Sequence, residues 1–472
     1  MKTKMKWQRA ATGLACFLAM GMARAQTPPR TARLWLTTVN GKELLARQPQ
    51  PLRFSPVFSA KRVIKVNPME QYQKMEGFGF ALTGGSAQLL MRMAPATRAA
   101  LLQQLFAPAG PGIHVSYLRI SIGSSDMNDH AFTYDDMPAG ESDPQLAHFS
   151  LGPDRTTVIP VLRQILKINP RIKILGSPWS APGWMKTNDA LKGGQLKTDD
   201  YGVYARYFVR YLRAMGKAGI RLSAITVQNE PLNPKNTPSM VMFAPEEDRL
   251  IAQYLGPALA RAGLHTRIQI YDHNPDVASY PLSILADPAA NRYVEGTAFH
   301  LYGGSVRTLT RVHHLYPNKD LFLTEQSVTQ SPRDKRLEIA APVQGVLIGA
   351  TRNWARNVLL WNLAANAQAG PHTLHGGCTS CWGALTLTGN RVKRNVAYYA
   401  LAHFSKFVPP GSRRIGSNPL EQLANVAFLT PRGKIVLVVA NTGNFTARFH
   451  IRYLGQTLAA DLPAESVGTF VW

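Results

Sequence analysis

The sequence predicts an α/β fold, a (β/α)8 TIM barrel with an accessory β-sandwich domain built from both chain ends. Three observations support this. From about residue 73, short strand-forming runs alternate with amphipathic helical stretches, the pattern of parallel strands joined by helices. Eight such runs can be counted, and eight parallel strands close a barrel. The two ends of the chain contain strand-like runs without helices between them.

The expected barrel strands are apolar, β-branched runs bounded by turn residues. They are residues 75–82, 115–122, 172–177, 224–228, 267–271, 296–300, 321–324 and 357–361. Helices are expected at residues 97–106, 156–167, 200–217, 246–262 and 341–356. The stretch 200–217 is the clearest, because Tyr204, Phe208 and Met215 recur on one helical face and Gly219 follows as a stop signal. We expect this aromatic face to be core rather than a binding platform.

Strand-like runs at both ends predict the accessory domain. They are residues 32–37 and 62–66 near the start, and 426–430, 435–441, 447–453 and 467–472 near the end. The chain is therefore expected to have four parts. These are a signal peptide at 1–25, a linker with sandwich strands at 26–70, the barrel at 71–405, and the C-terminal part of the sandwich at 406–472.

The first 25 residues are typical of a cleavable export signal. Basic residues at 2, 4, 6 and 9 precede a mostly apolar stretch over 10–22, and Ala23, Arg24 and Ala25 form an A-x-A cleavage site. The apolar stretch is short for a membrane span, and no later run of about 20 apolar residues follows. We expect a secreted or periplasmic protein without a transmembrane segment; the alternative is an uncleaved anchor.

The chain is strongly basic, with a net charge of +25, of which five positive charges lie in the signal. Such a surplus favours attraction to anionic surfaces such as lipid headgroups, envelope polysaccharide or nucleic acid. The basic residues are nevertheless scattered, without a long Lys/Arg run or a nucleic-acid-binding module. We therefore expect weak attraction to anionic envelope surfaces and no nucleic-acid partner. The oligomeric state is left open.

Removal of the signal also removes Cys16 and leaves Cys378 and Cys381. In an oxidising compartment, this C-T-S-C sequence is expected to form a local disulfide. A zinc site is one alternative, with His372 and His375 as further ligands. A redox-active C-x-x-C is another, although that motif belongs to small thioredoxin-like units.

Two of the expected strands stop on a glutamate. One leads into Asn229, Glu230 and Pro231, and the other ends in Thr324 and Glu325. In a (β/α)8 barrel, the carboxyl ends of the strands converge on one mouth. Two carboxylates about 5–5.5 Å apart are the equipment of a retaining glycosidase, one acting as acid/base and the other as nucleophile. Each glutamate taken alone could instead be part of a structural salt bridge.

Further polar and aromatic residues occur at the ends of the same strands. They are Arg119, Trp179, Asn229, His300, Tyr302 and Trp361. Sugars present both C–H faces and hydroxyl groups, so a sugar site needs aromatic surfaces and hydrogen-bonding side chains. An arginine on a neighbouring strand, such as Arg119, would favour ionisation of the nucleophile, while the closeness of the two carboxylates would help to keep the acid protonated.

The chain resembles glycoside hydrolase family 30, the glucosylceramidase-like enzymes, which include glucosylceramidases and β-1,6-glucanases. The resemblance covers roughly residues 70 to 472. Its motifs are GFG at 77–79, LRISIGSSD at 118–126, SPWSAPGWMKTN at 177–188, QNEP at 228–231, TE at 324–325, WNLA at 361–364 and YYALAHFSKF at 398–407. The resemblance implies a (β/α)8 barrel that carries a β-sandwich built from both chain ends.

The resemblance also implies roles for individual residues. Glu230 would be the acid/base and Glu325 the nucleophile, with net retention of configuration. Asn229 would hydrogen-bond the substrate 2-hydroxyl. Arg119, Trp179 and Trp361 would line the subsite for the cleaved sugar. Tyr302 would lie beside the nucleophile, with His300 nearby.

One departure from the family pattern concerns Gly84. Many relatives read G-F-G-G-A-x-T-D-A, whereas this chain reads GFGFALTGGS at 77–86, with Gly84 in the place of the aspartate. If that aspartate grips sugar hydroxyls, its loss would cost about 1–3 kcal/mol of binding unless another group replaces it. Ser86 and Asp126 are the candidates. The departure raises a question about the substrate rather than the reaction.

The predicted function is a secreted retaining β-glycoside hydrolase that cleaves the β-glucosyl bonds of a glucan such as β-1,6-glucan, or of a glucosyl lipid. β-Xylosidase, β-fucosidase and glucuronoxylanase activities remain alternatives within the family. Outside it, the alternatives are a non-catalytic carbohydrate-binding barrel and a basic envelope-associated protein. The partner is expected to be a carbohydrate or glycolipid substrate. No metal or other cofactor is expected, because both catalytic groups are side chains and no metal or nucleotide motif is present.

Overall fold

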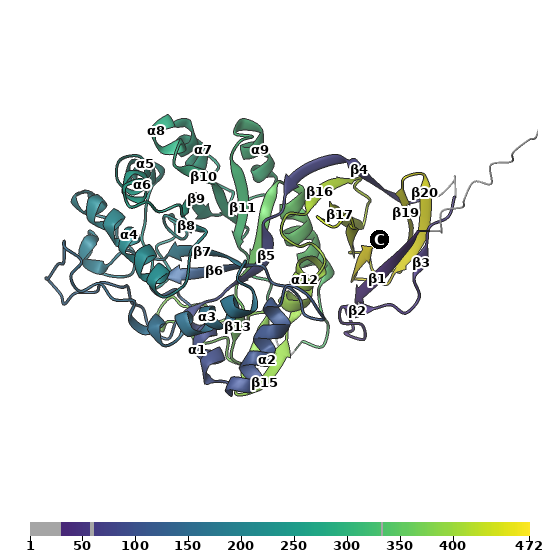
Figure 1. Ribbon diagram of the computed structural model, residues 1–472, viewed down its shortest axis with the longest axis horizontal. Helices are drawn as coiled ribbons and strands as arrows, with labels where there is room; N and C mark the ends of the chain where they lie inside the picture. Colours follow the sequence, from purple (N-terminus) through teal and green to yellow (C-terminus); the bar gives the residue numbers. More distant parts are fainter. Residues whose placement is uncertain (1–29, 57–60, 332–333) are drawn as a thin grey trace, which may run out of the picture.

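The computed structural model describes residues 30–472 except 57–60 and 332–333. The expected signal peptide at 1–25 lies outside the described residues. Figure 1 shows two parts side by side, a barrel ringed by helices and a smaller β-sandwich formed by both chain ends. The predicted fold class is thereby confirmed. None of the helices in the described ranges has the length and apolar character needed to span a bilayer.

Eight parallel strands close the barrel in the order β10-β11-β12-β5-β6-β7-β8-β9. Each overlaps one of the eight expected runs. They are β5 (Gly77–Ala81), β6 (Tyr117–Ile122), β7 (Lys173–Pro178), β8 (Ala224–Thr226), β9 (Arg267–His273), β10 (Val294–His300), β11 (Asp320–Glu325) and β12 (Ala355–Leu360). Nearly all of their residues are buried, because helices cover the outside of the barrel and side chains fill its interior.

Helices follow most strands and bury one apolar face against the barrel. They are α1 (Gly84–Arg92), α2 (Pro95–Phe106), α3 (Val158–Ile168), α4 (Tyr201–Lys217), α5 (Ala244–Arg249), α6 (Gly256–Arg261), α7 (Ser279–Ala286), α8 (Pro288–Asn291), α9 (Arg307–Leu315), α10 (Ala340–Pro342), α11 (Gly349–Arg352) and α12 (Val396–Ser405). Short 3-10 turns occur at Gly152–Arg155, Gly183–Met185 and Thr198–Asp200.

Two expected helices are continuous but change their winding. The stretch predicted at 246–262 contains a π-helical segment, Leu250–Leu255, between α5 and α6. The stretch predicted at 341–356 contains a π-helical segment, Val343–Ile348, and ends at Arg352, because residues 355–360 form β12. The aromatic face of α4 is buried, as expected.

In the described part of the chain, the sandwich sheet follows the order β2-β1-β21-β18-β17-β16-β4-β19-β20, with β3 beside β1. Its strands are β1 (Thr31–Thr37), β2 (Ala46–Arg47), β3 (Leu52–Arg53), β4 (Val63–Lys74), β16 (Arg413–Ser417), β17 (Leu423–Leu429), β18 (Ile435–Asn441), β19 (Ala447–Tyr453), β20 (Gln456–Leu462) and β21 (Ser466–Val471). β1 pairs with β21, so the two ends form one sheet. β4 runs to Lys74, four residues past the expected end of the N-terminal sandwich part at 70.

Helix α12 joins the barrel to the sandwich. Phe404 contacts Phe78 of β5 at 5.4 Å and Phe428 of β17 at 6.2 Å between ring centroids. The buried His403 ring bonds Thr469 of β21 at 2.7 Å and Thr37 of β1 at 2.9 Å. Aromatic packing and these hydrogen bonds therefore tie both chain ends to the barrel. A small sheet of β13 (Ala364–Ala365), β14 (Leu385–Thr388) and β15 (Arg391–Arg394) adds to the barrel side.

Candidate active site

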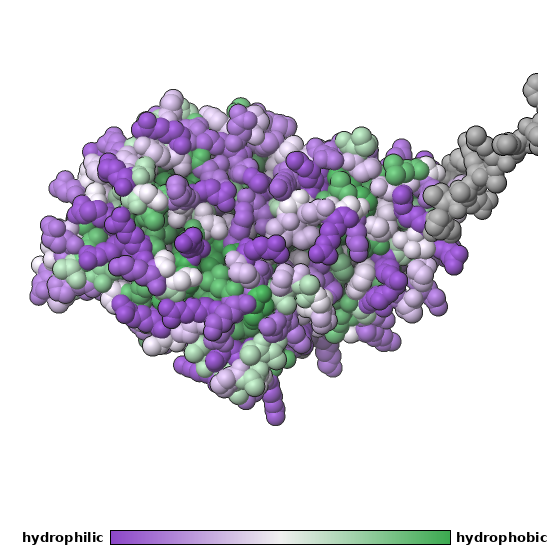
Figure 2. Space-filling model, viewed as in Figure 1, coloured by the Kyte–Doolittle hydropathy of each residue, from purple (hydrophilic) through white to green (hydrophobic). Residues whose placement is uncertain are grey.

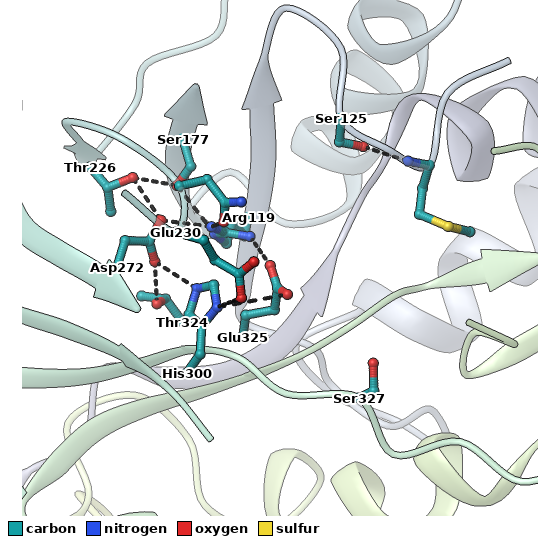
Figure 3. Close-up of polar contacts among 12 residues, drawn as sticks. Arg119, Ser125, Ser177, Thr226, Glu230, Asp272, His300, Thr324, Glu325 and Ser327 are labelled. Carbon is teal, nitrogen blue, oxygen red and sulfur yellow. Dashed lines mark hydrogen bonds and ion pairs between the residues drawn. The ribbon is translucent and has the colours of Figure 1, made fainter. Parts of the chain in front are cut away.

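The two glutamates expected at strand ends face the same histidine ring. Nδ1 of His300, at the end of β10, lies 3.1 Å from Oε1 of Glu230 and 3.8 Å from Oε1 of Glu325. These two carboxylate oxygens are therefore less than about 7 Å apart, a bound that includes the 5–5.5 Å spacing of retaining enzymes. Figure 3 shows both carboxylates converging beside Arg119 and His300.

Backbone contacts at the end of β8 position Glu230. Its N–H donates to the carbonyl of Asp272 at 3.0 Å, and the preceding Asn229 N–H donates to Pro178 at 2.8 Å. Glu230 has a φ of 45°, in the left-handed region that residues other than glycine seldom occupy. Strained backbone held by its surroundings is common at functional sites. The two neighbouring strands thus hold the turn that directs Glu230 into the mouth.

Arg119 of β6 is fully buried and organises the site. Nη1 donates to Oε2 of Glu325 at 2.5 Å, and Nη2 donates to Asp272 at 2.6 Å and to Oδ1 of Asn229 at 2.7 Å. Its Nε donates to the hydroxyl of Ser177 at 3.1 Å. The guanidinium therefore fixes the positions of side chains from four other strand ends.

Asp272 is a site residue that the sequence-based reasoning missed. It is fully buried near the end of β9 and accepts hydrogen bonds from Arg119, His300 Nε2 (3.1 Å), Thr226 (2.8 Å) and Thr324 (2.5 Å). Burial acts to raise its pKa, but the charge of Arg119 and the contact with His300 hold that pKa far below the usual range. The sequence did contain a signal for this residue, because its carboxylate lies one position beyond the expected strand 267–271.

His300 is held between carboxylates. Burial acts to lower its pKa, but the charges and hydrogen bonds of Glu325, Asp272 and Glu230 outweigh burial and raise the pKa to about 10. The ring is therefore an imidazolium at neutral pH. His300 lies beside Glu325, the residue expected to be the nucleophile, although the ring is closer to Glu230 than to Glu325.

The pKa values of the two glutamates shift in the opposite sense to that expected. Burial acts to raise the pKa of Glu230, but His300 and the amide of Asn233 lower it to about 2. Burial raises the pKa of Glu325, and His300 and Arg119 offset only part of this effect. The expectation considered mutual repulsion of the two carboxylates. In the structure, the imidazolium of His300 is the stronger influence on Glu230.

Aromatic residues line the side of the site next to Arg119. The Trp179 and Trp361 rings are buried with centroids 5.6 Å apart, and the Arg119 guanidinium lies 4.8 Å from the centre of the Trp179 ring. On another side, the hydroxyl of the partly exposed Tyr302 donates to Oε1 of Glu325 at 3.0 Å. All eight expected site residues thus lie at the mouth of the barrel.

The expected disulfide is present between Cys378 and Cys381. Because the two sulfur atoms are bonded to each other, neither is a thiolate available to zinc, which removes the proposed zinc alternative. Cys381 packs in the same apolar cluster as Trp179 and Trp361, with Cys378 against it. The disulfide loop is therefore part of the wall beside the two tryptophans.

The structure shows what occupies the space beside Gly84. A Cβ atom built there would lie 1.9 Å from Nδ2 of Asn128, so the Asn128 side chain occupies the space that an aspartate would need. Ser86 cannot serve as a substitute, because its hydroxyl bonds the backbone of Ala364 at 2.7 and 3.0 Å. Asp126 remains: it is buried, and burial with the charges of Glu325 and Glu230 raises its pKa to about 8.

One cluster at the site has metal-ligand spacing. Ligand atoms of Glu230, His273 and His300 lie within 4.8 Å of one another. His300, however, directs both ring nitrogens at carboxylates, Nδ1 at Glu230 and Nε2 at Asp272. Both ring nitrogens of His300 therefore contact carboxylates. The cluster is arranged as a hydrogen-bonded network rather than as a set of free ligands around a metal ion.

Two family models match the chain. The model described as the glycosyl hydrolase family 30 TIM-barrel domain matches residues 75–408, and that described as the family 30 beta sandwich domain matches 411–470. These spans correspond to the barrel and to the C-terminal part of the sandwich.

Curated relatives and solved structures agree with these models. The endo-1,6-beta-D-glucanase of Aspergillus fumigatus is 37% identical over 425 residues, covering 84% of this chain and 85% of that protein. The lysosomal acid glucosylceramidase of Mus musculus is 32% identical, covering 87% and 82%. The solved structure of the endo-beta1,6-glucanase BT3312 has a TM-score of 0.87 at 34% identity, covering 94% of this chain and 99% of that one.

Proposed function

Because the chain belongs to glycosyl hydrolase family 30, we propose that it cleaves β-glucosyl bonds with net retention of configuration, and that its substrate is a β-1,6-linked glucan. That the protein is a β-glycoside hydrolase follows from its family. The retaining mechanism is supported by one observation above all: Glu230 and Glu325 both face Nδ1 of His300, and only Glu325 is paired with an arginine.

In the first step, a carboxylate oxygen of Glu325 forms a bond with the anomeric carbon. The bond from that carbon to the leaving oxygen breaks, and Glu230 gives a proton to that oxygen. Arg119, at 2.5 Å from Glu325, favours the ionised carboxylate that this attack needs. Tyr302 donates to the other oxygen of Glu325 and so restricts its rotation.

Glu230 needs a proton for this step, yet its pKa of about 2 leaves it ionised in the free site. We assign the proton store to His300, which is protonated and donates to Oε1 of Glu230 at 3.1 Å. Transfer of this proton produces a neutral glutamic acid beside a neutral imidazole. When an uncharged sugar binds and excludes water, the state with protonated His300 and ionised Glu230 becomes less favourable. The neutral pair is then favoured, and the proton moves to Glu230.

In the second step, water replaces the leaving group. Glu230, now a carboxylate, removes a proton from that water as its oxygen attacks the anomeric carbon, and the bond to Glu325 breaks. Glu230 then returns the proton taken from water to the neutral His300 ring, which restores the ion pair of the free site. Two inversions at the same carbon leave the configuration of the sugar unchanged.

The remaining residues are assigned to sugar binding. Trp179 and Trp361 provide the apolar surface for a sugar ring. Asn229, whose amide oxygen is fixed by Arg119, directs its N–H groups to the 2-hydroxyl. Asp126, with a pKa of about 8, is protonated at neutral pH and can donate as well as accept a hydrogen bond to a hydroxyl. We therefore assign to Asp126 the binding of sugar hydroxyls that the family resemblance links to an aspartate at position 84.

The choice of a β-1,6-glucan is supported by the relatives that carry this activity in their names, at 37%, 36% and 34% identity. A glucosyl lipid is the second candidate, since the mouse glucosylceramidase is 32% identical. We further propose export, on the basis of the leader at residues 1–25 and cleavage after Ala25.

The test combines stereochemistry with a substrate panel. We expect NMR of early products from an aryl β-glucoside to show the β-anomer first; an α-anomer would disprove retention. The panel consists of aryl β-glucoside, β-xyloside and β-fucoside, β-1,6-glucan and glucosylceramide. Highest kcat/KM on β-1,6-glucan is expected, and activity confined to xyloside or fucoside would overturn the assigned substrate.

A further inference from the structure

A second feature of the molecule lies outside the barrel mouth, on α4. Its exposed residues Arg206, Arg210, Arg213 and Lys217 are spaced by four, three and four positions, which places them along one face of the helix. Neither α4 nor the adjacent α3 contains an acidic residue. Like charges at these spacings repel one another along a helix. An anionic ligand would relieve that repulsion.

The basic face borders a hollow of about 500 Å³ between α4 and residues 145–155 of the loop that follows β6. We call this hollow the basic groove. Its cationic lining residues are Arg155, Arg206, Arg210, Arg213 and Lys217, and none of the described residues that line it is acidic. In Figure 1, α4 lies on the flank of the barrel away from the sandwich, and that flank in Figure 2 carries mostly hydrophilic side chains.

Two guanidinium groups of the groove are held in place by the loop. Arg206 donates to the carbonyl of Pro144 at 2.8 Å, and Arg210 donates to the carbonyls of Gln145 (3.1 Å) and Leu146. The Arg210 guanidinium also lies 5.9 Å from the centre of the Phe149 ring. Since a guanidinium has five N–H donors, each retains donors for a ligand. The groups are thus positioned before a ligand arrives.

The cations of the groove are not neutralised from within the described protein. No ion pair among the described residues involves any of the five. The carboxyl nearest in sequence to Arg155 is that of Asp154, which is buried and accepts from the Tyr134 hydroxyl at 2.6 Å. Asp143, in the same loop, instead bonds His148. The charge of the groove is therefore available to an external anion.

We propose that the basic groove binds an acidic polysaccharide, a glycan that carries carboxylate groups on successive sugars. Guanidinium groups bind carboxylates through paired hydrogen bonds. The cationic row from Arg206 to Lys217 is about 16 Å long, which suits a chain of several sugars rather than a single ion. The choice of a glycan rather than another polyanion rests on the proposed function.

A membrane surface fits this face less well. Proteins that dock on bilayers combine basic residues with exposed apolar anchors. The large hydrophobic residues that are exposed in the described structure include Phe243, Leu374 and Phe445, and none of them lies on α3, on α4 or in residues 145–155. The groove therefore offers charge without an apolar anchor, as expected for a water-soluble polyanion.

The test uses the full chain and oligogalacturonate, a uronate oligomer, as the probe in a titration at fixed salt. The groove variant is Arg155→Gln, Arg213→Gln and Lys217→Gln, which leaves Arg206 and Arg210 on their loop carbonyls. The matched control is Arg33→Gln, Lys42→Gln and Lys65→Gln, exposed residues of the sandwich part that change the net charge by the same amount. Hydrolysis of an aryl β-glucoside, which engages only the barrel mouth, is measured on all three proteins.

We expect the groove variant to bind the oligomer roughly tenfold or more weakly, and the control within about twofold of the parent, with unchanged hydrolysis in both. Binding should weaken as salt is raised. Equal losses in both variants, or no binding by the parent, would refute the groove. Tighter binding to duplex DNA or phosphatidylserine vesicles, lost in the groove variant, would also overturn the glycan assignment. A parent that binds oligogalacturonate through the groove but hydrolyses no glycoside would refute the proposed function alone.

Discussion

The side-chain amide of Asn233 donates a hydrogen bond of 2.7 Å to Oε2 of Glu230, the oxygen that His300 does not contact. The amide of Asn236 approaches the same oxygen at 3.4 Å. The proposed acid/base is thus held by His300 on one oxygen and by two asparagines on the other. Amide donors favour the ionised carboxylate, so the loop that contains Asn233 and Asn236 influences both the orientation and the pKa of Glu230.

Replacement of Asn233 by alanine should raise the pKa of Glu230 by about one unit, because the ionised carboxylate loses a donor. Glu230 must be ionised to act as base on the glycosyl-enzyme, so the acid limb of the kcat profile should move to higher pH. An aryl β-glucoside with an activated leaving group makes this second step rate-limiting. Asn390→Ala, a surface change in the turn between β14 and β15, is the control. A lower kcat with an unchanged pH profile would show that Asn233 has only a structural role.

Glu325→Gln should lower kcat at least roughly a thousandfold, because an amide cannot form the glycosyl ester. The fold should persist, since Arg119 keeps its ion pair with Asp272 at 2.6 Å. Turnover of aryl β-glucoside and the circular dichroism spectrum measure the two effects. Glu465→Gln, which alters only an exposed ion pair with Arg336, is the control and should retain activity. Parent-like turnover by Glu325→Gln would reassign the nucleophile.

Glu230→Ala should separate substrates by their leaving groups. General acid assistance contributes roughly 10²–10⁴-fold when the leaving oxygen needs a proton. The kcat/KM for a β-1,6-glucan should therefore fall by such a factor, whereas that for a dinitrophenyl β-glucoside should change little. Added azide should then restore kcat with the dinitrophenyl substrate and release β-glucosyl azide, because azide attacks without a base. A uniform loss on both substrates, without azide rescue, would argue against the acid/base role.

His300 should make the folded state less stable at alkaline pH. Its folded pKa of about 10 exceeds the ordinary value of about 6.5, so its contribution is complete below about pH 6.5 and is lost as the pH rises toward 10. Urea unfolding at pH 6.5, 8 and 9.5 measures this trend. His300→Asn should lower the free energy of unfolding at pH 6.5 by roughly 3–5 kcal/mol, because buried carboxylates lose their counter-charge, and should flatten the trend. His265→Asn, an exposed change, should do neither.

Gly84→Ala should destabilise the protein by roughly 1–3 kcal/mol, because the added methyl group overlaps the Asn128 side chain. Combining it with Asn128→Ala should recover part of the loss, which thermal unfolding of the double variant measures. Gly216→Ala is the matched control. No atom lies within 4 Å of a Cβ there, so this helical substitution should be neutral or stabilising. Equal effects at the two glycines would show that the space at position 84 is not limiting.

The strands of the barrel and several of its helices could be predicted because each of these elements is marked by a local pattern. All eight strands were recognised from apolar runs, and α4 from the spacing of Tyr204, Phe208 and Met215. Helices α9 and α12 were not predicted as elements. α9 buries only Leu309 and Val312, a narrow apolar stripe, while α12 is buried almost throughout and lacks an exposed polar face to mark its period. β16 and β20 were also missed.

The candidate site was predictable to the extent that strand ends converge. That rule placed Glu230 and Glu325 together, and applied one residue further along β9 it would have included Asp272. It could not show that Ser86 bonds Ala364, or that Asn128 fills the space beside Gly84. Those contacts join residues distant in the chain, and no local pattern encodes them.

From the sequence alone follow the fold class and the pair of glutamates, because period and strand-end position are properties of neighbouring residues. The sequence favoured a disulfide between Cys378 and Cys381 but left a zinc site and a redox pair open, and the structure decided for the disulfide. The tertiary structure alone decided the electrostatics. Five barrel strands place His300 and Arg119 among the carboxylates of Glu230, Asp272 and Glu325. Since a pKa depends on burial and on every charge within a few ångströms, the protonation states of Glu230 and Glu325 are set only once the barrel has closed.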